Sequence, residues 1–197
     1  KDPSVRPALR AGLGLVVLQQ ITGQPSVLSY ATPILANVPG LQASASVLLA
    51  LFKVLATTVS VLLVETKGRK LLLTIGCSMM LAALCVMVVA FHEDDDSTTS
   101  NSSNNSRFVL LGMFAYIGGY QIGFGPITWL MISEVFPQDV RCKAVAVAVQ
   151  ANFALKALVQ FLVPLLQDTF GIDKTFGIFG ILTAYSIWFV RHSVPET

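Results

Sequence analysis

Long runs of apolar residues dominate this chain, and short polar segments separate them. A helix needs about 20 apolar residues to cross the hydrocarbon core of a bilayer. Six stretches reach that length, at residues 13–36, 43–64, 71–91, 108–132, 144–166 and 172–190. The last of them carries Asp173 and Lys174 at its start and is the most polar there. The pattern predicts an all-α integral membrane protein with six transmembrane helices.

Composition and charge agree with that prediction and exclude a soluble domain. Hydrophobic residues make up 54% of the chain and charged residues 12%, and the mean hydropathy is +0.70. Such a composition is too apolar for a soluble protein of this length. The net charge of +2 gives no indication of a nucleic-acid partner. Nine of the thirteen basic residues fall on one side of a six-span topology: Lys1, Arg6, Arg10, Lys67, Arg69, Lys70, Arg141, Lys143 and Arg191.

The positive-inside rule therefore places both chain ends on the cytoplasmic side. The chain does not begin with methionine, and its first residues are polar and basic. We expect it to start in a loop of a longer polypeptide, after several further spans.

Residues 92–106 are polar and acidic without apolar positions, which predicts a disordered loop on the opposite, non-cytoplasmic side. Asn101 and Asn104 begin glycosylation sequons there, a pattern that also arises by chance in Asn/Ser-rich tracts.

The cysteines and histidines do not indicate an enzyme, a metal site or a bound cofactor. Cys77 and Cys85 lie in one apolar span, where cysteine acts as a small hydrophobe, and Cys142 lacks metal-ligand spacing to either. His92 and His192 lie at span ends without a nucleophile or metal ligand nearby in sequence. We therefore expect no catalytic residue, no metal ligand and no cofactor.

Two glutamines give the first span a polar face. Gln20 and Gln24 are one helical turn apart, and an amide both donates and accepts hydrogen bonds, as sugar hydroxyls do. These side chains suit a polyhydroxylated ligand, and they equally suit a bridge between neighbouring helices. Pro25 and Pro33 predict that this span is kinked or partly unwound near the glutamines, as in many transporter sites.

The fourth span contains residues that predict a second break. Gly123, Gly125 and Pro126 separate Gln121 from Trp129, and glycine and proline loosen the hydrogen bonding of a helix. A bend there brings Gln121 and Trp129 towards one cavity. An indole can pack on the face of a sugar ring, or it can anchor a span at the membrane interface.

Asn152, Lys156 and Gln160 recur at four-residue intervals in the fifth span and share one stripe of the helix. An ionised lysine within a membrane costs several kcal/mol unless it is paired or solvated, so Lys156 is a functional candidate. Lys53 in the second span is another candidate, or a structural partner of nearby polar groups. No Asp or Glu lies deep in a span, so a proton-carrying carboxylate would have to come from elsewhere in the polypeptide.

Several ordered motifs together resemble the C-terminal half, spans seven to twelve, of a sugar porter of the major facilitator superfamily. The similarity extends over essentially the whole chain. The Thr22-Gly-Gln-Pro25 variant and the string from Gly118 to Ile127 resemble especially plant and algal plastid-type xylose-symporter-like proteins and a minor class of animal glucose transporters. The motifs are Gln19-Gln-Ile-Thr-Gly23, Glu65-x-x-Gly-Arg-Lys70, Gly125-Pro-Ile-Thr-Trp129, Ser133-Glu-Val-Phe-Pro137, Asn152-Phe153 and Val194-Pro-Glu-Thr197.

The resemblance implies transport of a hexose or pentose by alternating access, as a facilitator or a proton symporter, with the cavity completed by an N-terminal half of the same polypeptide. It implies sugar contacts from a set of polar and aromatic residues: Gln19, Gln20, Gln121, Trp129 and Asn152, with Tyr30 at an outer gate. Gln24-Pro25 replaces the usual Ile-Asn, so Gln24 or Ser26 would supply the lost polar contact. Lys156 stands where an asparagine is usual and would change ligand preference.

A charged cluster at cytoplasmic helix ends also matches the family pattern: Glu65, Arg69, Lys70, Glu134 and Arg141. We expect these side chains to pair across helices when an inner gate is closed and to separate when it opens. Plain positive-inside topology would explain the basic members, but not the two glutamates.

The sequence leaves two alternative functions open: a transporter of the same superfamily for another polyol, an organic ion or a phosphorylated metabolite, and a six-helix channel subunit. The pattern does not distinguish a plastid envelope from a vacuolar or plasma membrane.

Overall fold

The computed structural model describes residues 5–36, 44–96, 102–136 and 138–193, and within them the regular structure is helical. The prediction of an all-α fold is therefore confirmed. The helices are α1 (Val5–Ile21), α2 (Gln24–Ala36), α3 (Ala45–Lys67), α4 (Arg69–Asp96), α5 (Ser102–Ile122), α6 (Phe124–Val135), α7 (Gln138–Phe170) and α8 (Ile172–Ser193).

These helices form the six predicted crossings, because two of the crossings are broken. The first consists of α1 and α2, and the fourth of α5 and α6. Four stretches are long and apolar enough to span a membrane, at Ser46–Lys67, Arg69–Ala90, Phe108–Glu134 and Arg141–Phe170. The break leaves α1 and α2 individually too short for that criterion, and polar residues such as Asp173 and Lys174 dilute the apolar character of α8.

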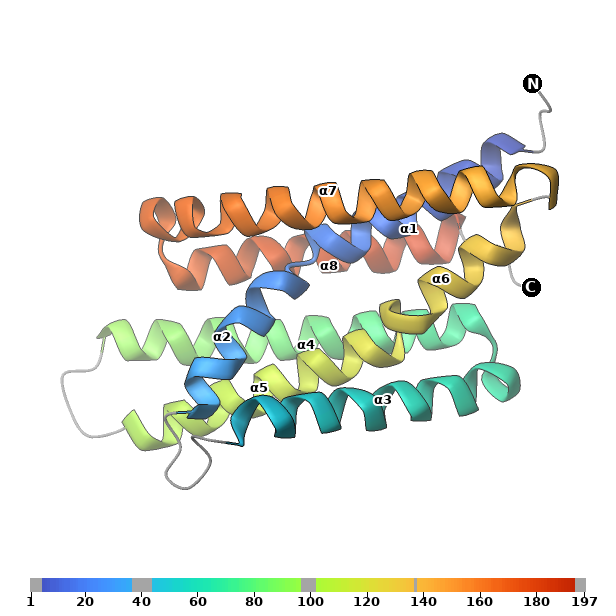
Figure 1. Ribbon diagram of the computed structural model, residues 1–197. Helices are drawn as coiled ribbons and strands as arrows, with labels where there is room; N and C mark the ends of the chain where they lie inside the picture. The colour runs from blue at the N-terminus through green and yellow to red at the C-terminus, as the bar shows by residue number, and fades with distance from the viewer. Residues whose placement is uncertain (1–4, 37–43, 97–101, 137, 194–197) are drawn as a thin grey trace.

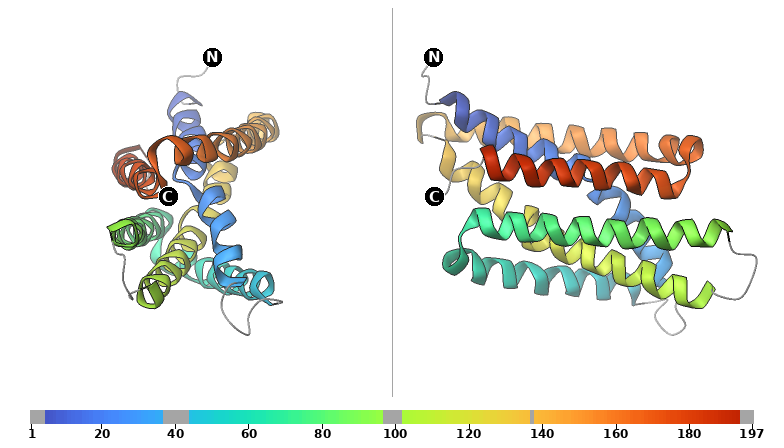
Figure 2. Two further views of the ribbon diagram at one scale, coloured as in Figure 1. Left: turned by 90° about the vertical axis from the view of Figure 1, so that its left-hand side faces the viewer. Right: turned by 180° about the vertical axis from the view of Figure 1, so that it is seen from behind.

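The two broken crossings run diagonally through the bundle (Figures 1 and 2). The crossing α1–α2 passes from the group of α7 and α8 towards α3 and α5, and α5–α6 passes the other way. α1 begins, and α8 ends, at the same end of the bundle, where α3 also turns into α4 and α6 leads into α7. The basic residues Lys67, Arg69 and Lys70 lie in that α3–α4 turn. This arrangement agrees with the topology inferred from charge.

The core lies between the helices and depends on close backbone approach of α4 and α5. Its largest fully buried side chains include Tyr116, Phe124 and Phe176. A Cβ atom added to Gly76 of α4 would lie 2.6 Å from the carbonyl oxygen of Gly119 and 2.7 Å from the Cα of Gly123. Small residues allow membrane helices to pack at such distances. Gly76 therefore fixes α4 against the break between α5 and α6.

The outer faces of α3 and α7 are covered with large apolar side chains that nothing in the described residues shields. Only 11% of the spanning stretch of α3 and 17% of that of α7 is buried, against 56% for α5–α6. Leu62 of α3 and Phe161 of α7 are each 69% exposed. Apolar surface of this extent is compatible with a bilayer or with further protein, and not with water.

The predicted loop at 92–106 is shorter in the structure than in the sequence prediction. α4 continues to Asp96 and α5 starts at Ser102, so helical backbone includes both ends of the segment. Residues 97–101, with the Asn101 sequon, lie outside the described residues, as does the side chain of Asn104. Disorder and glycosylation of this segment stay predictions.

Candidate substrate-binding site

The first break lies between Gln20 and Ser26, as the prolines predicted. Gly23 has a φ of 92°, a conformation that favours glycine. In the next turn, the N–H groups of Ser26 and Val27 both donate to the Gly23 carbonyl, at 3.1 and 3.0 Å. The Thr22 carbonyl is thereby left without a helical donor. The buried hydroxyl of Tyr116, in α5, donates to it at 2.9 Å.

The second break follows Ile122, where Gly123 separates α5 from α6. Pro126 has no N–H, so the Ile122 carbonyl four residues earlier cannot receive its usual helical hydrogen bond. The hydroxyl of Ser60, in α3, donates to that carbonyl at 2.8 Å, and Ser60 is fully buried. Both breaks are therefore completed by a side chain from another crossing, as backbone groups in a membrane require.

Gln19 and Asn152 connect the two breaks to α7. The Gln19 Nε2 atom donates to the Phe124 carbonyl, in the first residue of α6, at 3.2 Å. The Asn152 Nδ2 atom donates to Gln19 Oε1 at 3.0 Å. Gln19 is 3% exposed and Asn152 8%. Here the glutamine acts as a bridge between helices, one of the two alternatives for such amides, and a sugar contact would require it to exchange these bonds.

Three buried polar atoms near the breaks have no hydrogen-bond partner among the residues that the structure describes: Gln20 Oε1, Ser26 Oγ and Thr128 Oγ1. Their side chains are 3%, 4% and 0% exposed. A buried polar group without a partner costs about 1–3 kcal/mol. A ligand hydroxyl or a water that reached these atoms when the breaks move would remove that cost.

The break directs Gln121 and Trp129 to different neighbours. Gln121 Nε2 donates to Thr57 Oγ1 of α3 at 2.8 Å. Trp129 is half-buried against a cluster that includes Val16 of α1 and Ala148 of α7. This packing of Trp129 between helices differs from that of a lone anchor at a membrane surface.

The remaining predicted contacts are less enclosed. Lys156 and Gln160 are exposed on α7, whereas Asn152 of the same stripe points inward. Gln24 and Lys53 are half-buried. Tyr30 lies in α2, but its side chain is not among the described ones, so its predicted role at an outer gate is not tested.

Of the predicted charged cluster, the structure pairs two members. Arg69, at the start of α4, forms an ion pair with Glu134, near the end of α6. Arg141 Nε donates to the Phe136 carbonyl at 3.3 Å and so holds the junction of α6 and α7. Glu65 and Lys70 have no ion pair with any described side chain. Whether the cluster works as a gate stays a prediction.

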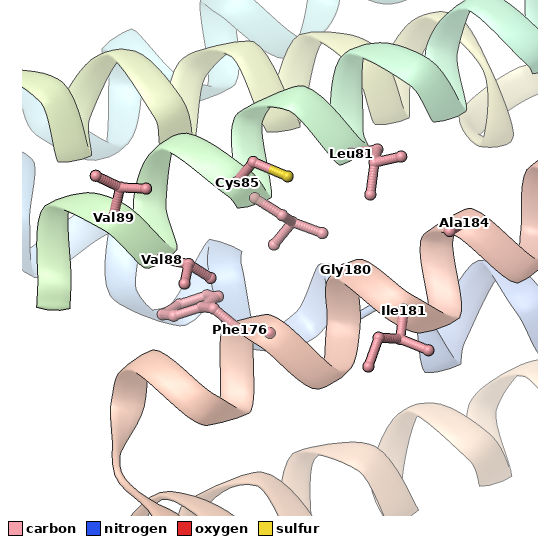
Figure 3. Close-up of a pocket in the computed structure, with 10 residues that line it drawn as sticks. Leu81, Cys85, Val88, Val89, Phe176, Gly180, Ile181 and Ala184 are labelled. Carbon is pink, nitrogen blue, oxygen red and sulfur yellow. The ribbon is translucent and has the colours of Figure 1, made fainter.

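Two hollows that the described residues form lie away from these side chains. One of about 440 Å³ lies between α4 and α8 and is apolar throughout, with Leu81, Cys85, Phe176 and Ile181 in its lining (Figure 3). A second, of about 460 Å³, adjoins it at Cys85. Neither includes a predicted sugar contact. No group of metal-ligating side chains was found among the described residues.

Two partners of the breaks, Tyr116 and Ser60, were not predicted from the sequence, nor was Thr57, which holds Gln121. Pro126 is a local signal that the Ile122 carbonyl lacks a donor. The donor itself is 62 residues away in the chain and is not marked by any local pattern.

All 197 residues match the family model described as "Sugar (and other) transporter". The chain belongs to this family of membrane transporters, and its fold is that of half of a major facilitator superfamily protein. It is 40% identical over 195 residues to D-xylose-proton symporter-like 1 of Arabidopsis thaliana, covering 96% of this chain and 37% of that protein. To the chloroplastic D-xylose-proton symporter-like 3 of the same organism it is 40% identical over 196 residues, covering 96% and 33%.

A solved structure of the proton:xylose symporter XylE bound to 6-bromo-6-deoxy-D-glucose superimposes with a TM-score of 0.81 at 25% identity, over 96% of this chain and 40% of that one. The chain thus spans only between a third and two fifths of the length of these similar proteins.

Proposed function

We propose that this chain is the C-terminal half of a transporter that carries a monosaccharide, a hexose or a pentose, across a membrane by alternating access. The observation that carries the proposal is the buried amide of Gln19, in a family of sugar transporters: it links the two broken crossings by donating to the Phe124 carbonyl, and it accepts a hydrogen bond from Asn152 of α7. Amides that both donate and accept hydrogen bonds are suited to sugar hydroxyls of the same character. The names of the similar xylose symporters favour a sugar over the organic ion or phosphorylated metabolite.

Binding at this site would exchange hydrogen bonds rather than add them. A sugar hydroxyl can replace Asn152 as donor to Gln19, or the Phe124 carbonyl as acceptor, while Gln20 and Ser26 offer polar atoms without a partner. Net contributions of roughly 0.5–1.5 kcal/mol per hydrogen bond, for four or five bonds, suit millimolar affinity, which corresponds to about 4 kcal/mol. A carrier benefits from such weak binding because it must release its cargo.

In this proposal Gln19, Gln20, Gln24, Gln121, Trp129 and Asn152 contact the sugar, Tyr30 closes the outer side, and Lys156 adjusts ligand preference. The ion pair between Arg69 and Glu134 belongs to the closed inner gate. Rocking of one half against the other then exposes the site to each side in turn.

Proton coupling is the variant that the names of the similar proteins favour. In the described spans, the acidic residues, Glu65 and Glu134 among them, lie at or near helix ends. A proton-binding carboxylate would therefore come from the rest of the polypeptide. A plastid envelope fits one of the similar proteins, which is chloroplastic, and vacuolar and plasma membranes are the alternatives.

Uptake of radiolabelled xylose and glucose by the full-length polypeptide, in cells lacking their own transporters, tests this proposal. Saturable uptake that collapses with a protonophore would identify a symporter, and uptake that persists would identify a facilitator. Gln20→Ala should raise the KM for the sugar, whereas Gln150→Ala, an exposed glutamine of α7, should not. Absence of uptake of either sugar by the wild-type protein would contradict the proposal.

A further inference from the structure

Each broken crossing has a main-chain carbonyl that has lost its backbone donor, and each receives a buried side-chain donor from a different crossing. Tyr116 of α5 donates to Thr22 at the first break, and Ser60 of α3 donates to Ile122 at the second. Neither residue belongs to the set of predicted sugar contacts. Both are fully buried, and the hydroxyl of each donates its proton to a main-chain carbonyl.

The two breaks are also tied to each other. Tyr116 of the second broken crossing holds the end of the first break, at Thr22, while Gln19 of the first broken crossing holds Phe124, just after the second break. The hydrogen bonds are thus reciprocal. A change in the bend at one break must stretch or release the bond that supports the other.

α3 contacts the second break through two side chains that lie one helical turn apart. Thr57 accepts the side chain of Gln121, and Ser60, three residues further along α3, donates to the main chain of Ile122. A serine within a helix usually bonds to the carbonyl four residues earlier in its own helix. Ser60 instead donates across to Ile122 of α5, the residue between Gln121 and the start of the break at Gly123.

We propose that Ser60 and Tyr116 are positioning residues of the sugar site, which supply the hydrogen bonds that the broken helices lack and thereby join the two breaks into one unit. This inference rests on the proposed function for its transport readout. Loss of either hydroxyl would let the carbonyl seek another donor and would shift Gln19 or Gln121 from its place. The expected effect is therefore on the affinity for sugar, and not only on the amount of folded protein.

The central experiment is a double-mutant cycle of Ser60→Ala and Pro126→Ala in the full-length polypeptide. Ser60→Ala should raise the KM for sugar about fivefold, the size expected from loss of one hydrogen bond. Alanine at position 126 restores an N–H that can donate to the Ile122 carbonyl. In the Pro126→Ala background the Ile122 carbonyl keeps a donor, the N–H of the alanine at position 126, even when the Ser60 hydroxyl is removed. Ser60→Ala should therefore change KM by less than about twofold in that background. Ser60→Thr, which keeps the hydroxyl, should retain a KM near that of the wild type.

Ser186→Ala is the matched control. Ser186 is as buried as Ser60 and makes a hydrogen bond of the same length, 2.8 Å, but to Leu182 in its own helix. For the first break, Tyr116→Phe keeps the ring and removes the donor, and it should raise KM by a similar factor. Tyr185→Phe, at an exposed tyrosine of α8, should have no effect.

Two outcomes would overturn the inference: a Ser60→Ala effect of equal size in the wild-type and Pro126→Ala backgrounds, or lower uptake capacity with an unchanged KM. Either would mean that Ser60 acts through packing alone. In case Pro126→Ala abolishes uptake, the same four proteins are also compared by thermal unfolding. There, Ser60→Ala should lower the unfolding temperature less in the Pro126→Ala background than in the wild type. If the wild-type protein carries no sugar, the proposed function fails, whereas a transporting wild type with an unchanged KM in both Ser60→Ala and Tyr116→Phe defeats only this inference.

Discussion

Asn152 donates a side-chain hydrogen bond to Gln19 at 3.0 Å, between two buried amides 133 positions apart in the chain. The same glutamine donates to the first residue of α6. A single side chain of α1 thus connects α6 and α7, and a ligand that bonds to Gln19 in place of either partner breaks one of these connections.

Asn152→Ala would leave the buried Gln19 carbonyl without its donor. We expect a loss of about 1–3 kcal/mol in stability, the cost of a buried polar group without a partner, together with a raised KM for sugar. Thermal unfolding of the purified protein with and without xylose measures the first, and uptake measures the second. Gln160→Ala, two turns further along α7 and exposed, serves as the control and should leave stability unchanged. Equal behaviour of the two variants would contradict the role of the bridge.

Gly76→Ala should destabilise the protein by about 1–3 kcal/mol, as overpacking does. The new methyl group would meet the backbone of Gly119 and Gly123, which cannot move away as a side chain can. Gly177→Ala in α8 is the control, because nothing lies within 4 Å of a Cβ added there. That variant should stabilise the protein by about 0.5–1 kcal/mol, since alanine is favoured over glycine in a helix. Thermal unfolding compares the two, and a neutral Gly76→Ala would show that α4 and α5 are not packed so closely.

Reversal of the charge on Arg69 should reduce the maximal rate of uptake while it leaves thermal stability almost unchanged. The side chains of Arg69 and Glu134 are 28% and 34% exposed, and pairs of this kind contribute about 0–1 kcal/mol. Such an energy is small for folding, but it is sufficient to shift a balanced equilibrium between two states of a carrier. The double reversal, Arg69→Glu with Glu134→Arg, should recover part of the rate. Failure of the double variant to exceed both single variants would argue against a paired gate.

Trp129→Phe should keep most of the packing against α1 and α7 while it shortens the flat surface available to a sugar ring. We expect a raised KM with only a small change in thermal stability, and a larger loss of saturable uptake in Trp129→Ala. Trp188→Ala tests the specificity of that effect, because Trp188 is exposed on α8 and stacks on Tyr185 and His192. If the variants at 129 and 188 had the same KM, Trp129 would be an anchor rather than a sugar contact.

Much of the fold was predictable because the signals are local. Apolar length predicted six crossings. Pro25 and Pro33 predicted a break near Gln20, and Gly123, Gly125 and Pro126 predicted another in the fourth span; the structure contains both breaks. The extent of α4 and α5 into the segment 92–106 was not predicted, since polar composition alone does not fix where a helix ends. The sugar contacts rest on family resemblance and the amide chemistry, and they stay predictions.

The sequence by itself determined that the chain crosses a membrane, which end carries the basic residues, and that backbone hydrogen bonding has gaps near Pro25 and Pro126, because hydrophobicity and the absent N–H of proline are properties of single residues and short segments. Only the tertiary structure decided which side chains meet at those gaps. Ser60 and Tyr116 are each remote in sequence from the carbonyls they support, 62 and 94 positions away. Their pairing depends on how α3 and α5 pack beside the breaks, and helix packing is a collective result of many side chains.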